Sequence, residues 1–337
     1  MLNRLLAVAC AGCLAFSLNT AWAAPPADVV STIHSFDPTK GEFPEGLAVD
    51  KRNNVYVGLF FLGEIWKFAP NGTPSLFATL DNGQFGGAIV GLAVDDDGNV
   101  YVCNASNVAG THGIWKVDHL GRATLFAALD PLSHPEAVPL TPFPPVGSPA
   151  LEYGFPNGLT FDEQGNLFVT DSFLALIWKI TKSGEVTVWV QDPLLDYNLL
   201  VGNIGANGVE FDRSSMFVTN TAQGSVVRVP IPQKDQRPKA EVFVQDPTLL
   251  GADGLAFDIH HNMYVAIDFQ NTLVRIAPDA TITTLATQSE GLDYPASTSF
   301  GESRGERTHL YFTNAGVIFG TPTLKKIDID IPGVRLP

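Results

Sequence analysis

The feature that most restricts the fold of this chain is one short phrase that returns six times along it. The copies are PEGLAVD from Pro44, IVGLAVD from Ile89, PNGLTFD from Pro156, GANGVEFD from Gly205, GADGLAFD from Gly251 and a degenerate PASTSFG from Pro295. They follow one another at intervals of roughly 45 to 65 residues, close to the length of one blade of a β-propeller. The phrase therefore predicts a ring of similar units.

Each of the first five copies of the phrase is followed by three more short segments of the same kind, and the sixth copy by two. A segment such as NVYV, one such as EIWKF and one such as SLFATL recur in that order, and they are rich in β-branched and aromatic residues. Turn-forming residues (Gly, Asn, Asp, Pro) bound them, as expected of strands, and no helical period runs through them. Six units of four strands predict an all-β, six-bladed β-propeller.

The sixth unit lacks a fourth strand, whereas the N-terminal region has one to spare. The last unit ends after the segment that begins at Thr323, and a strand-like segment, VVSTIHSF, precedes the first phrase. We expect Val29–Phe36 to pair with Thr323–Asp330 and so to close blade 6, which leaves no open sheet edge between the first and last blades. Residues 24–337 would then form a single propeller domain.

Residues 1–23 have the pattern of a secretory signal peptide. Arg4 precedes an apolar run from Leu5 to Leu18, and a small-residue motif, AWA, ends at Ala23. We therefore expect cleavage near this point and a secreted or periplasmic product. No later apolar run is long enough for a membrane-spanning helix.

The charge and the cysteine content narrow the functional classes further. The chain has 35 Asp and Glu against 20 Lys and Arg, a net charge of -15, which argues against nucleic acid or an anionic membrane as a partner and favours cations. Cys10 and Cys13 lie in the signal segment, so Cys103 alone would remain and no intrachain disulfide could form. We expect a monomer that is held together by its apolar core.

One position of the phrase, the residue before the glycine, varies between copies and is called the slot residue here. The six slot residues are Glu45, Val90, Asn157, Asn207, Asp253 and Ala296. Four of them carry side-chain oxygens, and equivalent positions of a ring converge on its axis. An all-oxygen set suits Ca²⁺, with Mg²⁺, Mn²⁺ or Zn²⁺ as less favoured occupants. The alternative, purely structural interpretation is that Asn and Asp before Gly only form turns.

The register Glu, Asn, Asn, Asp around six units resembles the gluconolactonase, senescence-marker-protein (regucalcin) and luciferin-regenerating-enzyme-like family. This family is related to the calcium-dependent phosphotriesterases, which include diisopropyl fluorophosphatase and the paraoxonases. The resemblance covers the chain after the signal segment, and the stretch PASTSFG is similar to a sixth-blade TSxxFG stretch of the gluconolactonases. Paired catalytic histidines like those of the paraoxonases have no clear match, so the resemblance favours the lactonase-like members.

The resemblance implies that Glu45, Asn157, Asn207 and Asp253 bind one divalent metal at a mouth of the central channel. Asn157 would be a ligand or a contact to substrate, and Asp253 a ligand that also serves as general base or nucleophile. A metal there polarises a carbonyl oxygen. We therefore expect an exported, Ca²⁺-dependent lactonase or esterase that acts on a small lactone or ester, with Asp253 and Asn157 as its catalytic residues.

Further polar residues follow the second strand of several units and lie at the same face. They would either support the metal ligands or simply begin turns, and they are Asn104, Asp171, Asn220, Asp268 and Asn314. His112 lies in a loop of that face, where we expect a solvated histidine rather than one that transfers protons.

Two long connections, residues 130–155 and 192–205, are predicted to overhang the slot residues. Aromatic residues in them would line an apolar pocket and favour hydrophobic lactones or esters over sugars, namely Phe143, Tyr153, Phe155 and Tyr197.

Two other functions fit a propeller. One is an exported, non-enzymatic binding propeller of the NHL type, and the other is a propeller similar to strictosidine synthase that has little use for metal. A pure binding propeller has no reason to place two carboxylates and two carboxamides in the slots. The slot residues therefore favour the enzyme.

Overall fold

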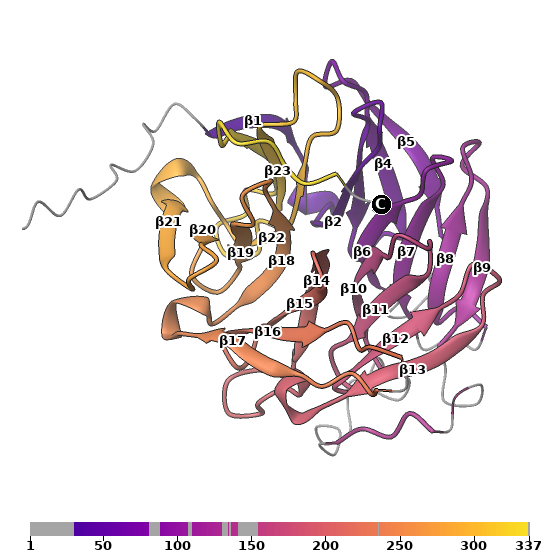
Figure 1. The fold of residues 1–337 in the computed structure, drawn as a ribbon. Coiled ribbons are helices and arrows are strands. Elements are labelled where there is room, and N and C mark those ends of the chain that lie inside the picture. Colours follow the sequence, from indigo (N-terminus) through magenta and orange to yellow (C-terminus); the bar gives the residue numbers. More distant parts are fainter. Residues whose placement is uncertain are drawn as a thin grey trace, which may run out of the picture.

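The protein is a closed ring of six four-stranded antiparallel sheets (Figure 1). This computed structural model describes residues 30–80, 88–106, 110–129, 134, 136–140, 154–234 and 236–335. The all-β, six-bladed propeller predicted from the repeat is confirmed. Within the described ranges, no helix is long and apolar enough to cross a membrane. Short 3-10 turns lie at Pro38–Lys40, Pro193–Leu195, Pro247–Leu249 and Gln288–Glu290.

The blades follow the repeat in order. Blade 1 consists of β2 (Pro44–Val49), β3 (Val55–Leu59), β4 (Glu64–Phe68) and β5 (Pro74–Thr79). Blade 2 consists of β6 (Ala88–Val94), β7 (Val100–Ala105), β8 (Gly113–Val117) and β9 (Ala123–Ala128). Blade 3 consists of β10 (Pro156–Phe161), β11 (Leu167–Asp171), β12 (Leu176–Ile180) and β13 (Val186–Gln191).

The second half of the ring repeats the same plan. Blade 4 consists of β14 (Ala206–Asp212), β15 (Ser215–Asn220), β16 (Ser225–Pro230) and β17 (Glu241–Gln245). Blade 5 consists of β18 (Ala252–Phe257), β19 (Met263–Ile267), β20 (Thr272–Ile276) and β21 (Ile282–Ala286). Blade 6 consists of β22 (Pro295–Phe300), β23 (His309–Asn314), β24 (Thr323–Asp328) and β1 (Val30–Ser35).

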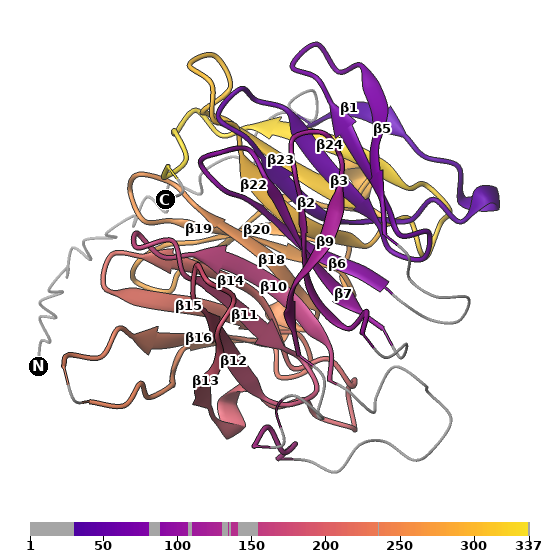
Figure 2. The ribbon, with the colours of Figure 1, turned by 90° about the vertical axis from the view of Figure 1, so that its right-hand side faces the viewer.

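The first strand of each blade lines the central channel. Consecutive first strands contact one another around the ring, and β22 contacts β2 to complete it. Figure 2 shows the blades from the side. The channel end at which the first strands begin is called the slot face, because it carries the slot residues; the end at which they finish is the far face. Loops between second and third strands therefore belong to the slot face, and hairpins between first and second strands belong to the far face.

The apolar core lies between neighbouring blades. An aromatic ring on the second strand packs against the first-strand phenylalanine of the next blade, with ring centroids 5.1–5.3 Å apart. These pairs are Tyr101 with Phe161, Phe168 with Phe211, Phe217 with Phe257, and Tyr264 with Phe300. The phenylalanines of the phrase are thus core residues that join blade to blade.

The N-terminal strand closes blade 6, as predicted. β1 pairs with β24 in antiparallel register from Val30 opposite Ile327 to Ser35 opposite Thr323. Phe36 continues the closure into the core between blades 6 and 1, where it packs against Phe68. Residues at opposite ends of the chain therefore close the ring. Residue 29 of the predicted strand lies outside the described ranges.

Deletion of residues 24–36 should lower the stability strongly. The truncated chain would expose β24 as an open edge and would lose the buried Phe36 side chain, and burial of one such side chain contributes about 2–3 kcal/mol. Thermal unfolding followed by circular dichroism measures the effect against the chain that begins at residue 24. Equal melting temperatures for the two would show that the closure adds no stability.

Candidate metal centre

Every first strand carries an irregularity at the slot. The residue before the slot residue pairs with the second strand, and pairing resumes with a shifted register at the second residue after the slot residue. The shifts lie between Pro44 and Leu47, Ile89 and Leu92, Pro156 and Leu159, Ala206 and Val209, Ala252 and Leu255, and Pro295 and Thr298. A β-bulge bends its strand and re-aims the side chain within it. All six slot residues thus share one unusual backbone position.

The glycine that follows the slot residue lets neighbouring blades touch. A Cβ added to it would lie under 3.0 Å from the backbone carbonyl oxygen of the slot residue in the next blade. This holds for Gly46 and Val90, Gly91 and Asn157, Gly158 and Asn207, Gly208 and Asp253, and Gly254 and Ala296. The glycines are therefore needed for close backbone approach, and they fix the spacing of successive slot residues.

Threonines of the second strands hold some of the same carbonyl groups. The hydroxyl of Thr219 donates a hydrogen bond to the Asp253 carbonyl at 2.6 Å, and that of Thr313 donates to the Glu45 carbonyl at 2.6 Å. Thr170 donates to the Asn207 carbonyl in the same way. Each bond crosses from one blade to the slot of the next, so the backbone of three proposed ligands is anchored from outside its own blade.

The two slot amides are oriented by neighbouring hydroxyl groups. Nδ2 of Asn157 donates to Ser172 Oγ at 3.1 Å, and Nδ2 of Asn207 donates to Thr221 Oγ1 at 3.0 Å. Both hydroxyl protons are already used, because they donate to the carbonyls of Ala206 and Ala252 in the next blades. The hydroxyl oxygens therefore accept from the amide nitrogens, which leaves each amide Oδ1, without a hydrogen bond to the described residues, as an acceptor for a cation.

Of the two slot carboxylates, Asp253 is buried and Glu45 is partly buried, and the charge of Glu45 acts on Asp253. Glu45 Oε2 is shielded from solvent and has no hydrogen-bond partner within the described ranges. Burial, together with the charge of Asp268, raises the pKa of Glu45 to about 8. Burial also raises the pKa of Asp253, and the charges of Glu45 and Asp268 add to this effect. Hydrogen bonds from the Gly254 N–H and the Asn207 side chain offset only part of it.

Asp268 is a third carboxylate at this site, and its role was not distinguished in the sequence. In blades 3 and 4, Asp171 and Asn220 pair with the first residue of the first strand, and Ser172 and Thr221 are the residues that come directly after them. In blade 5 Ile267 has this pairing position, so Asp268 corresponds to Ser172 and Thr221 and lies beside its own slot residue. Burial raises the pKa of Asp268 to about 7, although hydrogen bonds from the Phe269 N–H and the Tyr294 side chain oppose this.

The other polar residues after the second strands support loops instead. Asp171 accepts hydrogen bonds from the backbone of Phe155 and Leu174, and Asn220 donates to the carbonyls of Leu194 and Asp196. Similar bonds fix the loops around Asn104 and Asn314. Of the two interpretations open in the sequence, turn formation fits these four residues, whereas Asp268 belongs to the slot cluster.

Three expectations about the loops of the slot face need correction. His112 is buried, only 1% exposed, with Nδ1 against the backbone of Ser106, and is not a solvated loop histidine. Phe155 and Tyr197 are also buried and contact the ring of Phe173, so they are core residues and do not line an open pocket. Phe143 and Tyr153 lie outside the described residues.

The oxygen atoms of the slot side chains suit a divalent cation as ligands. Two amide oxygens are available as acceptors, Glu45 Oε2 lacks a hydrogen-bond partner among the described residues, and the charge of Glu45 adds to the cost of ionising Asp253. A cation would relieve the last two costs. In the described part of the chain, no three His, Cys, Asp or Glu residues are grouped as a metal site by themselves, so the amides are essential to the proposed set.

Comparisons with known proteins bear on the fold. No protein-family description and no curated protein matches the sequence. Among solved structures, regucalcin from Agrobacterium tumefaciens, described as a calcium-binding protein, is 18% identical with a TM-score of 0.65, over 91% of this chain and 95% of that one. A gluconolactonase from Xanthomonas campestris is 14% identical with a TM-score of 0.61, over 90% and 89%. The chain has the gluconolactonase and regucalcin fold.

The same fold also occurs with a different activity. Virginiamycin B lyase from Staphylococcus aureus is 15% identical with a TM-score of 0.54, over 85% of this chain and 82% of the lyase. The predicted resemblance is thus confirmed in architecture. Because the fold is shared by a lyase, the reaction has to be argued from the site.

The buried carboxylates give the metal-free protein a distinctive pH dependence. Glu45 and Asp268 keep their protons in the folded chain up to about pH 7–8 but lose them near pH 4 when unfolded. Between these values the unfolded chain binds fewer protons, so the stability should fall as the pH rises from about 5 to about 8. Calorimetric melting temperatures in EDTA would show the trend.

Added Ca²⁺ should reverse this loss. It has to displace protons from the carboxyl groups, so the rise in melting temperature should be larger at about pH 8 than at about pH 5. The Glu45→Gln variant, scanned in parallel, should lose most of that rise. A melting temperature that ignores Ca²⁺ at both pH values would count against a cation site at the slots.

The hydroxyl behind Asn207 supplies a second test. Thr221→Val keeps the shape of the side chain but removes the acceptor that orients the amide, so Ca²⁺ affinity measured by isothermal titration calorimetry should fall by about 10- to 100-fold. Thr187→Val changes an exposed threonine of β13 in the same way and should bind like the wild type. Unchanged affinity in Thr221→Val would mean that the amide needs no such orientation.

Proposed function

We propose that the protein is an exported, divalent-cation-dependent hydrolase of lactone or ester bonds that acts at the slot face. The observation that carries this proposal is the set of four slot side chains: two amides oriented by hydroxyl groups, the buried Asp253 and the partly buried Glu45, all on the same bulge of the repeat. Ca²⁺ is the proposed cation, held by Glu45, Asn157, Asn207 and Asp253. The related fold of a gluconolactonase and a calcium-binding regucalcin supports the choice.

The residues of the site have separate tasks in this proposal. A bound cation supplies Lewis-acid polarisation of the substrate carbonyl group. Asp253 takes the proton of the attacking water at its carboxylate; direct attack by this carboxylate is the covalent alternative. Asn157 binds the cation through the Oδ1 that its hydrogen bond to Ser172 leaves available; contact of this oxygen with a donor group of the substrate is the alternative role. Asp268 and the Asn207 side chain lie beside Asp253: the charge of Asp268 raises the pKa of Asp253, and the hydrogen bond from Asn207 lowers it.

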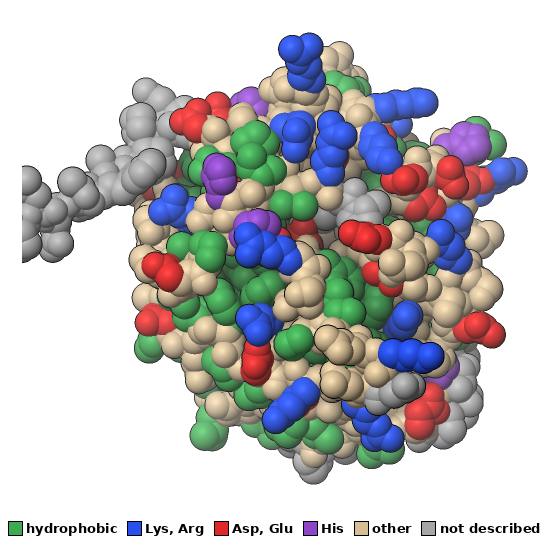
Figure 3. Space-filling model, in the orientation of Figure 1, with side chains coloured by type: hydrophobic (Ala, Val, Ile, Leu, Met, Phe, Trp, Pro, Cys, Tyr) green, Lys and Arg blue, Asp and Glu red, His purple; other side chains and the backbone are tan. Residues whose placement is uncertain are grey.

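The loops of the slot face favour apolar substrates. Phe61, Leu200 and Phe319 are 63%, 95% and 52% exposed, and they belong to three different loops of this face. Among the described residues of the loops between second and third strands, Asp268 is the only Asp, Glu, Lys or Arg. Figure 3 shows the far face for comparison, where side chains of both charges are abundant. A hydrophobic lactone or ester fits these exposed apolar side chains better than a sugar lactone.

The 192–205 connection contributes to the slot face. Its short hairpin is closed by a bridge between Asn198 and Gly202, and Gly202 lies near the ring of Phe269 in blade 5. The connection therefore spans blade 4 on the slot face, as the expected overhang requires. The 130–155 connection lies largely outside the described residues, and so does the signal segment on which export rests.

Substitutions at two slots separate the role of a base from that of a ligand. Asp253→Asn keeps an oxygen but removes the proposed base, so hydrolysis should fall by ~10²–10⁴ while some cation binding persists. Glu45→Gln removes ligand charge without removing the base, so its activity should recover at least partly with excess Ca²⁺. The measurement is hydrolysis of a panel of lactones and esters over a range of Ca²⁺ concentrations, with calorimetric titration of the metal.

The pattern of outcomes decides between the candidate functions. Equal rescue of both variants by Ca²⁺ would make Asp253 only a ligand. A wild type that hydrolyses nothing in the panel, or whose hydrolysis is unaffected by EDTA and by both changes, would favour the binding propeller or the metal-independent propeller.

A further inference from the structure

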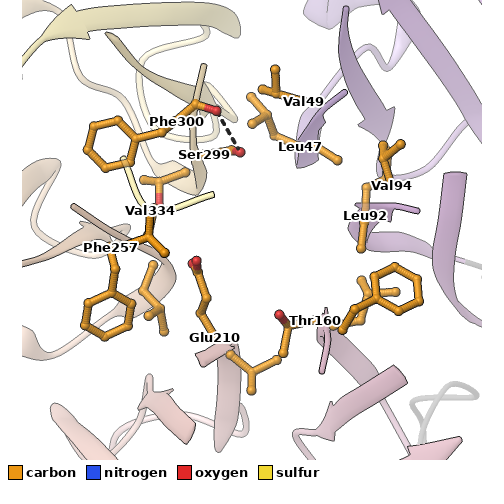
Figure 4. Close-up of a pocket in the computed structure, with 18 of the residues that line it drawn as sticks. Leu47, Val49, Leu92, Val94, Thr160, Glu210, Phe257, Ser299, Phe300 and Val334 are labelled. Carbon is orange, nitrogen blue, oxygen red and sulfur yellow. Dashed lines mark hydrogen bonds between the residues drawn. The ribbon is translucent and has the colours of Figure 1, made fainter. Parts of the chain in front are cut away.

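The far end of the channel holds a small cavity that the proposed function does not use. Its volume is about 80 Å³, and it is lined by the ends of all six first strands and by Val334 of the C-terminal segment (Figure 4). The second residue after each slot residue contributes to its wall: Leu47, Leu92, Leu159, Val209, Leu255 and Thr298. The walls are thus mainly aliphatic, with aromatic rings such as Phe257 and Phe300 further out.

Among the first-strand residues of this lining, one is a carboxylate. Glu210 of β14 is 8% exposed and points into the channel (Figure 4). It takes part in no hydrogen bond and no ion pair within the described ranges. The corresponding residues of the other five repeats are small and uncharged: Ala48, Ala93, Thr160, Ala256 and Ser299. A residue of that kind would suffice for packing, so the buried carboxylate needs another explanation.

The charges around Glu210 make its ionised form unfavourable unless a cation is bound. Burial raises its pKa well above the usual range, and the carboxylates of Asp212 and Glu302 add to the effect. Asp212 has a partner of its own, Nδ1 of His261 at 2.6 Å. Arg335 follows Val334 in the C-terminal segment and is exposed, and Arg307 of blade 6 uses Nη2 to bind the Gly333 carbonyl at 3.0 Å. The charges that shift the pKa of Glu210 are those of Asp212 and Glu302, and neither arginine is among them. The cavity therefore has excess negative charge in a poorly solvated place.

The C-terminal segment covers the cavity in a fixed position. The Val334 N–H donates to the Phe257 carbonyl at 2.9 Å, and the Gly333 N–H donates to the Arg307 carbonyl at 2.8 Å. A Cβ on Gly333 would collide with the Phe300 side chain, so the segment lies tightly against blade 6. Only a small occupant fits between Val334 and the channel wall.

We propose that this cavity binds a small organic cation, an alkylammonium group, with its charge on Glu210 and its alkyl part against the aliphatic wall. Its volume suits an occupant of only a few heavy atoms. A divalent metal fits less well, because, apart from the two carboxylates, the side-chain oxygens of the wall are the hydroxyl groups of Thr160, Thr298 and Ser299, and a hard cation prefers carboxylate and carbonyl oxygens. An alkylammonium gains both a carboxylate partner and apolar contact, and the phenylalanine rings of the wall favour it further.

Calorimetric titration of the full chain with n-propylammonium tests the proposal, in Ca²⁺ sufficient to occupy any site at the slots. We expect saturable binding with one site per chain, while 1-propanol, a neutral molecule of similar shape, binds much more weakly. Glu210→Gln should lower the affinity for n-propylammonium at least tenfold, as the removal of a buried charge partner does. Glu302→Gln should weaken it less, because Glu302 is more exposed.

Two matched variants locate the bound cation. Glu241→Gln makes the same change on β17 of the same blade, at a side chain that is 53% exposed, and should bind like the wild type. Glu45→Gln alters the opposite end of the channel and should also leave the affinity unchanged. Loss of binding in Glu45→Gln but not in Glu210→Gln would place the ammonium at the slots and overturn the proposal.

The folding of Glu210→Gln has its own prediction. Because the raised pKa makes the wild type lose stability as the pH rises above about 4.5, Glu210→Gln should melt no lower than the wild type at about pH 8. Glu210→Thr, which copies Thr160 of blade 3, serves as a second variant if the glutamine variant does not fold. Absence of saturable n-propylammonium binding to the wild type, or equal binding by the folded variants, would overturn the proposal.

Discussion

The contact on which the rest of the molecule depends is the close approach of consecutive first strands at the slot glycines. Each glycine faces the slot carbonyl of the next blade at a distance that no side chain would permit. This contact sets how near the strands come to the axis and thus how wide the channel is. Threonine hydroxyls from the second strands bind some of the same carbonyl groups. One repeated backbone contact therefore determines both the ring and the place of its functional side chains.

The repeat was enough to predict the fold, because six copies of a four-strand pattern leave few arrangements. It also predicted the closure by β1, since a missing strand and a spare strand stood at opposite ends of the chain. The orienting hydroxyls of Ser172 and Thr221 were not predicted. They lie in neighbouring strands, and their contacts with the slot amides depend on pairing that the bulge shifts. The position of Asp268 beside Asp253 was not predicted for the same reason. It depends on Ile267, and not Asp268, being the residue that pairs with the start of the first strand in blade 5.

The errors concern loops, where burial depends on contacts between segments that are distant in sequence. His112, Phe155 and Tyr197 lie in connections that the sequence marks as solvent-facing, yet each is buried. Asp171 and Asn220 explain part of this result, because their side chains bind loop backbone and draw the connections onto the blades. The apolar residues that do remain exposed, such as Leu200, stand at loop tips beyond the reach of these bonds.

The bulge also links the two ends of the channel within one strand. Asn207 begins β14 near the slot face, and Glu210, three residues later, points into the channel near the far face. In a regular strand an interval of three places two side chains on opposite sides. The register shift between Ala206 and Val209 removes one step, so both side chains can face the channel. The irregularity that forms the proposed metal site thereby also gives the neighbouring carboxylate its access to the second cavity.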